Sequence, residues 1–223
     1  MFESGMLQMD WIKAAQEDSQ WAMVVLHGLG DSMEGYRWVP RVLHFPNLNY
    51  LLVNAPDAYY GGFAWYDFTG NESLGIERSY GLMEQLLADL QSKGFPPEQV
   101  FLFGFSQGCL MTIETALRYP HRLAGCIGVS GYVHNPGAIA SRLSPVAREQ
   151  RLLLTHGTRD PLLPMDRIRP GLDQLKAAGM QFEFHEYEKE HTIIEPEIGL
   201  FRRFLQERLA APAPAPKADD KSG

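Results

Sequence analysis

The sequence predicts an α/β fold, in which helices cover both faces of a mostly parallel central sheet. Two features of the chain carry this prediction. Short apolar runs alternate with segments of helical periodicity, and turn-forming residues separate the two kinds of segment. The runs are apolar throughout rather than at every second position, which is typical of strands buried on both faces of a parallel sheet.

Six segments are predicted as strands. The last of them, 181–187 (QFEFHEY), alternates between apolar and polar residues like a half-exposed edge strand. The other five are apolar and occupy residues 21–26, 50–56, 99–104, 123–131 and 151–157.

Helical patterns lie between these strands and after the last one. Leu82, Leu86 and Leu90 recur at every fourth position in a segment that ends before Gly94 and Pro96. Further helices are predicted within residues 107–120, 165–180 and 195–209.

Two segments fit neither pattern. Residues 55–76 are rich in aromatic residues and glycine, and a loop of that length is usually functional. Residues 211–223 (APAPAPKADDKSG) have almost nothing to bury and are predicted to be a disordered tail. Because 223 residues are too few for two ordinary domains, residues 1–210 are predicted to form a single domain.

Composition excludes several functional classes. The formal net charge is −7, without a basic cluster, which argues against nucleic acid or an anionic membrane as the main partner. The chain has no apolar run long enough for stable membrane insertion. The only cysteines, Cys109 and Cys126, form neither a disulfide framework nor a metal-ligand pattern, so neither a metal nor another cofactor is predicted. The polar first twenty residues lack a signal peptide, and a cytoplasmic location is predicted.

The pentapeptide GFSQG (104–108) lies where a predicted strand passes into a predicted helix. In this context G-x-S-x-G is typical of a nucleophile elbow, a tight turn that exposes a serine at the end of a strand. Glycines two residues before and after Ser106 leave room for the neighbouring strand and helix. A plain serine–glycine turn is the alternative. A phosphate-binding loop is disfavoured because no lysine follows the glycines.

An elbow serine requires an acid and then a histidine, each on a loop after a strand. Asp160 follows the predicted strand 151–157, and His191 follows the last strand. Taken singly, these residues would be read as a turn aspartate and a surface histidine. Their order, and their position at the same edge of the sheet as Ser106, predict a catalytic triad of Ser106, His191 and Asp160.

Other acids and histidines fit these roles less well. Asp166 begins a predicted helix after Pro164 and is read as a helix cap. His156 lies inside a predicted strand, where a buried, hydrogen-bonded histidine is expected, and His185 lies within the edge strand. Neither histidine has the loop freedom that a general base needs.

The oxyanion hole needs two backbone N–H donors. The first is predicted to be Gln107, the residue after the nucleophile. The second is predicted to be Leu29, in the HGLGD loop (27–31) after the first apolar strand, where two glycines let the backbone approach a substrate. This loop is also read as a strand-to-helix turn with Asp31 as its cap, and the two interpretations are compatible.

These motifs resemble the acyl-protein thioesterase / small carboxylesterase family of α/β-hydrolases, also labelled phospholipase/carboxylesterase. The resemblance rests on HGLGD, GFSQG, HGTRDPLLP (156–164) and a histidine in the final loop, and it spans roughly residues 20–208. It implies the α/β-hydrolase fold and hydrolysis of carboxylic esters and thioesters without a cofactor, usually in the cytoplasm. The stretch AWYD (64–67) resembles the aromatic segment that leads to the acyl pocket in that family.

Three departures from the family pattern bear on substrate length rather than on the chemistry. Cys109 replaces a glycine that is usual after SQG. The segment before the histidine reads YEKEH (187–191), where the family more often has glycine, and Glu190 is directly beside His191. Residues 131–150 are expected to form a short cap.

Taken together, these features predict a serine hydrolase that cleaves esters or thioesters of short to medium acyl chains through an acyl-enzyme. Phe63, Trp65 and Tyr66 are predicted to wall the acyl pocket, and bulky walls would end that pocket early. The predicted substrates are small-molecule esters or acylated proteins. Lysophospholipid hydrolysis and protein depalmitoylation stay open, as does, from another class, an idle hydrolase fold that serves as a binding protein. The sequence does not fix the oligomeric state, and a homodimer is left open.

Overall fold

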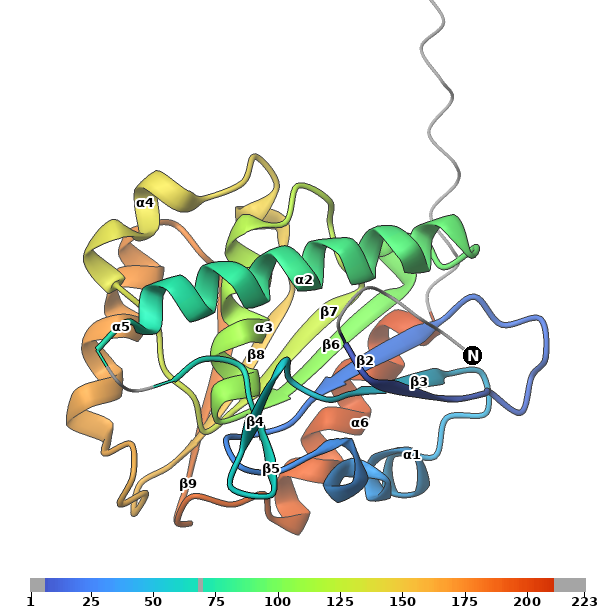
Figure 1. Cartoon of the computed structure of the whole chain (residues 1–223), viewed down its shortest axis with the longest axis horizontal. Helices are drawn as coiled ribbons and strands as arrows, with labels where there is room; N and C mark the ends of the chain where they lie inside the picture. Colours follow the sequence, from blue (N-terminus) through green and yellow to red (C-terminus); the bar gives the residue numbers. More distant parts are fainter. Residues whose placement is uncertain (1–6, 68–69, 211–223) are drawn as a thin grey trace, which may run out of the picture.

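The computed structural model describes residues 7–67 and 70–210, and in it the chain forms a seven-stranded sheet between two layers of helices (Figure 1). The strand order is β1-β3-β2-β6-β7-β8-β9. β1 (Met9–Ile12) is antiparallel to its neighbour β3, and the other neighbours in this sheet are parallel. The predicted α/β fold is therefore confirmed. The predicted tail 211–223 lies outside the described residues, and the domain boundary at 210 stays a prediction.

All six predicted strands are present, and their burial follows the sequence pattern. They are β2 (Ala22–Leu26), β3 (Asn49–Val53), β6 (Val100–Phe105), β7 (Gly125–Val129), β8 (Leu152–Gly157) and β9 (Phe182–Tyr187). The five apolar strands are buried along almost their whole length, whereas the edge strand β9 is partly exposed. Strand β1 was not predicted, because it is short, lies at the edge of the sheet and lacks a continuous apolar run.

Helices cover both faces of the sheet. Their bounds are α1 (Trp38–Leu43), α2 (Glu72–Ser92), α3 (Gln107–Arg118), α4 (Ile139–Arg142), α5 (Met165–Ala177) and α6 (Glu195–Leu209). One core cluster joins α2, α3 and α5 to one face of the sheet, and a second joins α1 and α6 to the other face.

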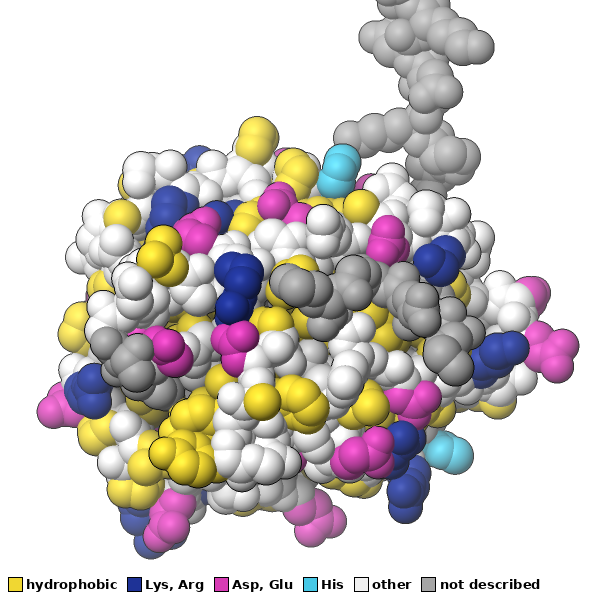
Figure 2. All heavy atoms as spheres, viewed as in Figure 1, with side chains coloured by type: hydrophobic (Ala, Val, Ile, Leu, Met, Phe, Trp, Pro, Cys, Tyr) yellow, Lys and Arg dark blue, Asp and Glu magenta, His cyan; other side chains and the backbone are white. Residues whose placement is uncertain are grey.

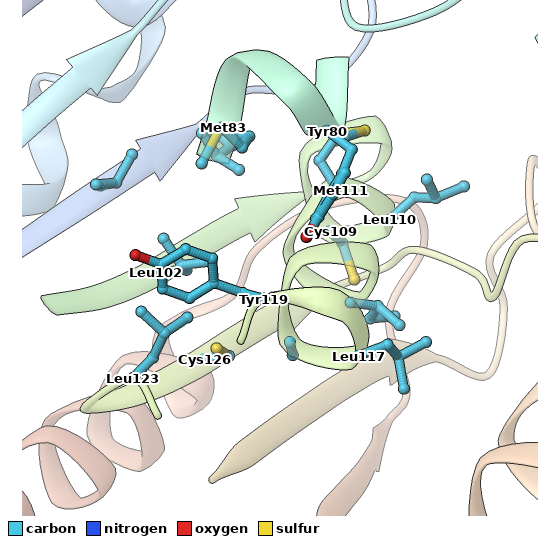
Figure 3. Close-up of a cluster of buried hydrophobic side chains, with 14 of the residues drawn as sticks. Tyr80, Met83, Leu102, Cys109, Leu110, Met111, Leu117, Tyr119, Leu123 and Cys126 are labelled. Carbon is cyan, nitrogen blue, oxygen red and sulfur yellow. The ribbon is translucent and has the colours of Figure 1, made fainter. Parts of the chain in front are cut away.

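Helix α3 lies between the sheet and α2, and it is buried along almost its whole length. Figure 3 shows Cys109 and Met111 of α3 among Tyr80 and Met83 of α2 and Leu102 of β6. A helix that is enclosed on all sides has little freedom to shift. Ser106, which directly precedes this helix, is therefore held in a fixed position.

The prediction of a long loop over residues 55–76 is wrong in part. β4 (Asp57–Tyr59) and β5 (Gly62–Ala64) form a small separate hairpin there, and α2 already begins at Glu72. The hairpin turns at Tyr60 and Gly61, which both have positive φ, as a tight two-residue turn requires. Strands of three residues are too short to give a pattern of their own, which is why the sequence did not predict them.

The described surface has mixed charge. On the face in Figure 2, basic side chains lie among acidic and apolar ones rather than in a patch of one sign. In the described part of the chain, no helix is both long and apolar enough to cross a membrane.

Candidate active site

Ser106 lies at the carboxyl end of β6, in the turn that leads directly into α3. Its backbone is left-handed, with φ 54° and ψ −113°, a conformation that costs a non-glycine residue about 1–3 kcal/mol. Ser106 N–H donates to the carbonyl of Val129 at 2.9 Å, and the Ser106 carbonyl accepts from Leu110 N–H at 3.1 Å. The turn is thus held both to the adjacent strand and to the helix.

The two flanking glycines have the steric role predicted for them. A Cβ added at Gly104 would lie 2.1 Å from the carbonyl oxygen of Gly108, and one added at Gly108 would lie 2.2 Å from the carbonyl oxygen of Leu26. Both contacts are with backbone, which cannot move aside as a flexible side chain can. The close approach of helix and strand at the elbow therefore requires glycine at both positions.

The structure brings Ser106, His191 and Asp160 together in one hydrogen-bonded line. His191 Nε2 is 2.9 Å from Ser106 Oγ, and His191 Nδ1 is 2.6 Å from Asp160 Oδ2. The Asp160 side chain is completely buried, whereas that of His191 is 13% exposed and reaches the cavity described below. This is the geometry of a nucleophile, a base and an acid that orients the base.

The carboxylate of Asp160 is fixed from its other side. Asp160 Oδ1 accepts hydrogen bonds from Leu162 N–H at 3.0 Å and Leu163 N–H at 2.9 Å. Asp166, the rival acid, lies exposed in the first turn of α5. Asp166 was predicted as a helix cap, but Pro164 occupies the cap position of α5 and no described side chain caps that helix.

The rival histidines lie where the sequence predicted them. His156 is buried in β8, and its Nε2 is 2.8 Å from the Leu163 carbonyl, to which it donates. Burial lowers the pKa of His156, which favours the neutral imidazole at 3.6 Å from Asp160. His185 lies on the edge strand β9.

The HGLGD loop lies against Ser106. A Cβ added at Gly28 would be 3.3 Å from Ser106 Cβ, and Leu29 lines the same cavity as Ser106. Among the described residues, Leu29 N–H has no hydrogen-bond partner. Gln107 N–H is the first amide of α3 and has no acceptor within the helix. Both predicted oxyanion donors are therefore available.

His27, which the sequence analysis did not single out, fixes this loop. Its Nε2 accepts from Ala55 N–H at 3.0 Å, so Nδ1 carries the proton and donates to the Gly28 carbonyl at 2.6 Å. Burial lowers the pKa of His27 and keeps this neutral tautomer. Its position beside the glycine of the loop was the only sequence signal for this role.

The side chain of Gln107 ties the aromatic segment to the elbow. Its Oε1 accepts from Trp65 N–H at 2.9 Å, and its Nε2 donates to the Tyr66 carbonyl at 2.8 Å. The indole N–H of Trp65 donates to the carbonyl of His27 at 2.9 Å, and Trp65 is fully buried. Phe63 and Trp65, predicted as pocket residues, are not among the described residues that line the cavity: Trp65 is buried in the core, and Phe63 is half-buried and packs against the core.

Ser106 and His191 open into a cavity of about 600 Å³. Its apolar lining comes from Leu29, Phe105, Leu162, Leu163 and Ile168, and its charged lining from Asp31, Glu72 and Arg167. Tyr66, the third predicted pocket residue, does line it. Tyr66 hydroxyl lies 3.1 Å from the hydroxyl of Tyr132, which belongs to the segment 131–150 expected to form a cap.

No group of side chains in residues 7–67 and 70–210 is arranged to hold a metal ion.

Comparison with known proteins places the chain in a family. The model of the family described as Phospholipase/Carboxylesterase matches residues 7–209. The chain belongs to the phospholipase/carboxylesterase family. Acyl-protein thioesterase 1 of Schizosaccharomyces pombe is 34% identical over 155 residues, which cover 64% of this chain and 69% of that protein. Acyl-protein thioesterase 1 of Saccharomyces cerevisiae is 27% identical over 222 residues, covering 90% and 98%.

A solved structure is similar to this chain over nearly its whole length. The crystal structure of esterase PE8 superposes with a TM-score of 0.79 at 27% identity, and the match covers 91% of this chain and 99% of that one. The family resemblance inferred from the four motifs is thereby confirmed, as is the α/β-hydrolase fold that it implied.

Proposed function

We propose that this member of the phospholipase/carboxylesterase family is a serine hydrolase that cleaves carboxylic esters or thioesters through an acyl-enzyme. The observation that carries the proposal is the unbroken line from Ser106 Oγ through His191 to the buried Asp160, with distances of 2.9 and 2.6 Å, beside a cavity of about 600 Å³. An idle binding protein would not require a serine held in a strained conformation against a histidine.

In the first half of the reaction, Ser106 Oγ attacks the carbonyl carbon while its proton passes to His191 Nε2. Asp160 holds the Nδ1–H tautomer and stabilises the imidazolium that forms. The N–H groups of Leu29 and Gln107 donate to the oxyanion, and the loss of one such donor typically lowers the rate ~10²–10³-fold. His191 then returns the proton to the leaving alkoxide or thiolate. Water releases the acyl group by the same steps.

The proposed substrates are small esters or acylated proteins with short to medium acyl chains. The relatives named acyl-protein thioesterase support the thioester alternative. The Tyr66–Tyr132 hydroxyl pair supports the limit on chain length, because methylenes gain little from packing on hydroxyls. If the cavity accepts long acyl chains, protein depalmitoylation and lysophospholipid hydrolysis are the alternative functions.

The cytoplasmic location stays a prediction, and a homodimer stays open. Two buried, unpaired cysteines, Cys109 and Cys126, accord with a reducing compartment. Cell fractionation and light scattering of the purified protein test these two points.

A p-nitrophenyl ester series from two to sixteen carbons, with a palmitoyl thioester alongside, tests the proposed substrate class. We expect kcat/KM to peak at roughly four to eight carbons, a range scaled to the gain per buried methylene. A steady rise through sixteen carbons would favour depalmitoylation or lysophospholipid hydrolysis. No turnover of any ester or thioester by pure, folded protein would refute the function itself.

A further inference from the structure

A lysine is buried beside His191, and the proposed reaction gives it no role. Lys189 belongs to the segment YEKEH, and its side chain is 1% exposed. Its Nζ donates to Thr192 carbonyl at 2.6 Å, to Glu197 Oε1 at 2.7 Å and to Ser130 Oγ at 3.3 Å. An ammonium has three protons, so each has an acceptor.

The partner carboxylate is buried and satisfied as well. Glu197 Oε1 also accepts from Thr155 Oγ1 at 2.5 Å, and Oε2 accepts from Ile194 N–H at 2.9 Å. Burial lowers the pKa of Lys189, and the hydrogen bond and charge of Glu197 oppose that shift. Two charges can share such a site only when each is paired and hydrogen-bonded. Lys189, Glu197, Ser130 and Thr155 are called the Lys189 network below.

The Lys189 network reaches the loop 188–194 on both sides of His191. Lys189 precedes the histidine, and its ammonium binds the carbonyl of Thr192, which follows it. Glu197 binds the amide of Ile194 at the end of the loop. The other members lie after β7 (Ser130) and in β8 (Thr155), so the loop is tied to the sheet edge that carries Asp160.

Backbone contacts add to this tie. The Lys189 carbonyl accepts from Arg159 N–H at 3.1 Å, next to Asp160. A Cβ added at Gly157 would lie 2.3 Å from the same carbonyl, so the loop lies directly on the end of β8. The loop itself has no helix or strand that would hold it in shape.

We propose that Lys189 is a positioning residue, whose buried ion pair with Glu197 holds the loop 188–194 so that His191 bridges Ser106 and Asp160. The inference rests on the proposed function, in which His191 is the general base. A displacement of a reacting group by about 1 Å can cost ~10²-fold in rate. A buried ion pair contributes little net stability, and its specific geometry is what an apolar pair in its place would not reproduce.

The test removes the network without leaving a charge unpaired. In Lys189→Met/Glu197→Met, two apolar side chains of similar length replace the pair, which is often tolerated in stability. We expect kcat for a short p-nitrophenyl ester to fall ~10²-fold while KM changes little, because neither residue lines the cavity. Lys189→Met/Glu197→Gln, which also leaves no charge unpaired and keeps an amide oxygen as acceptor at position 197, gives the answer if the first double variant does not fold, and we expect a smaller loss in the same direction.

Glu114→Gln is the matched control. Glu114 is also completely buried in an ion pair, 2.5 Å from Arg142, but it contacts no member of the triad. We expect this variant to lose stability without the fall in kcat. An equal fall in kcat in Glu114→Gln, at matched stability, would show that any buried pair matters equally and would overturn the proposal.

A readout that needs no turnover separates this proposal from the proposed function. The Nδ1 proton shared by His191 and Asp160 should give a low-field proton NMR resonance, assigned by its loss in His191→Gln. We expect it to broaden or vanish in Lys189→Met/Glu197→Met and to persist in Glu114→Gln. A folded double variant with wild-type kcat and an intact resonance would overturn the proposal. An inactive wild-type enzyme that shows the same resonance changes would refute the proposed function alone.

Discussion

Ser106 and His191 meet at 2.9 Å, yet the chain places them by different means. Ser106 is placed by local backbone geometry, with glycines at 104 and 108 and a buried helix that begins at the next residue. His191 lies on a loop without regular structure, which side chains from β8, α6 and the end of β7 hold in place. The proposed nucleophile can therefore be recognised from a pentapeptide, whereas the position of the proposed base depends on residues far away in the sequence.

The largest effect on activity is expected from substitution of Ser106, the residue that local backbone geometry places. Ser106→Ala should lower kcat by about 10⁶-fold, because the attacking oxygen is gone. Alanine is smaller than serine and meets the same backbone strain, so the melting temperature should stay near that of the wild type. Ester hydrolysis and thermal unfolding of the same preparation check both points. Retention of more than a few per cent of the activity would mean that Ser106 is not the nucleophile.

The second effect concerns how the base is oriented. Asp160→Asn should lower kcat by roughly 10⁴-fold, since an amide in place of the carboxylate favours the wrong tautomer of His191. Asp166→Asn, in the exposed first turn of α5, is the control and should leave the rate unchanged. If the Asp166 variant proved the more damaging in steady-state assays, the acid would be wrongly assigned.

The same contrast separates the features that the sequence could predict from those that it could not. Six strands of the central sheet were predictable because each is a short apolar or alternating run, and the meeting of Ser106, Asp160 and His191 was predictable because each follows a strand. Lys189 and Ser130, which form a hydrogen bond, are 59 residues apart in the sequence, so no local sequence pattern predicts their contact. In the sequence, YEKEH (187–191) stands out only as a departure from a family pattern, and nothing there assigns a role to Lys189.

The aromatic segment shows the limit in another way. Phe63 and Trp65 were predicted as pocket walls from their aromatic residue type and, for Trp65, from the resemblance of AWYD (64–67) to a family segment. In the structure Trp65 is buried in the core, where hydrogen bonds to Gln107 and His27 fix it, and Phe63 packs half-buried against that core. Residue type shows that an aromatic side chain is expected to be shielded from water, but tertiary contacts decide whether it packs in the core or lines the cavity.

A third prediction tests whether the elbow depends on backbone contact. Gly108→Ala should destabilise the fold by about 3 kcal/mol or more, at the upper end of overpacking, because its Cβ would lie 2.2 Å from the Leu26 carbonyl oxygen. Gly81→Ala is the control, since a Cβ there meets nothing within 4 Å inside α2. That change should instead stabilise by roughly 0.5–1 kcal/mol. Urea unfolding of both variants decides, and equal stabilities would contradict the steric account.

The smallest effect concerns the cavity rather than the triad. Each methylene that finds apolar cover should raise kcat/KM by up to about fourfold, until the chain reaches the Tyr66–Tyr132 pair. Tyr132→Phe should move the optimum to longer acyl chains by removing one hydroxyl. Tyr80→Phe removes a hydroxyl that binds Glu84 and should leave the optimum in place. An unchanged optimum in Tyr132→Phe would show that this pair does not limit chain length.

The reaction of the wild-type enzyme with a fluorophosphonate, followed by peptide mapping, tests the central claim most directly. The account predicts a single phosphonyl adduct on Ser106, and a labelling rate that falls steeply in His191→Gln because the serine then has no base. An adduct on another residue, or labelling of Ser106 at the wild-type rate without His191, would contradict it.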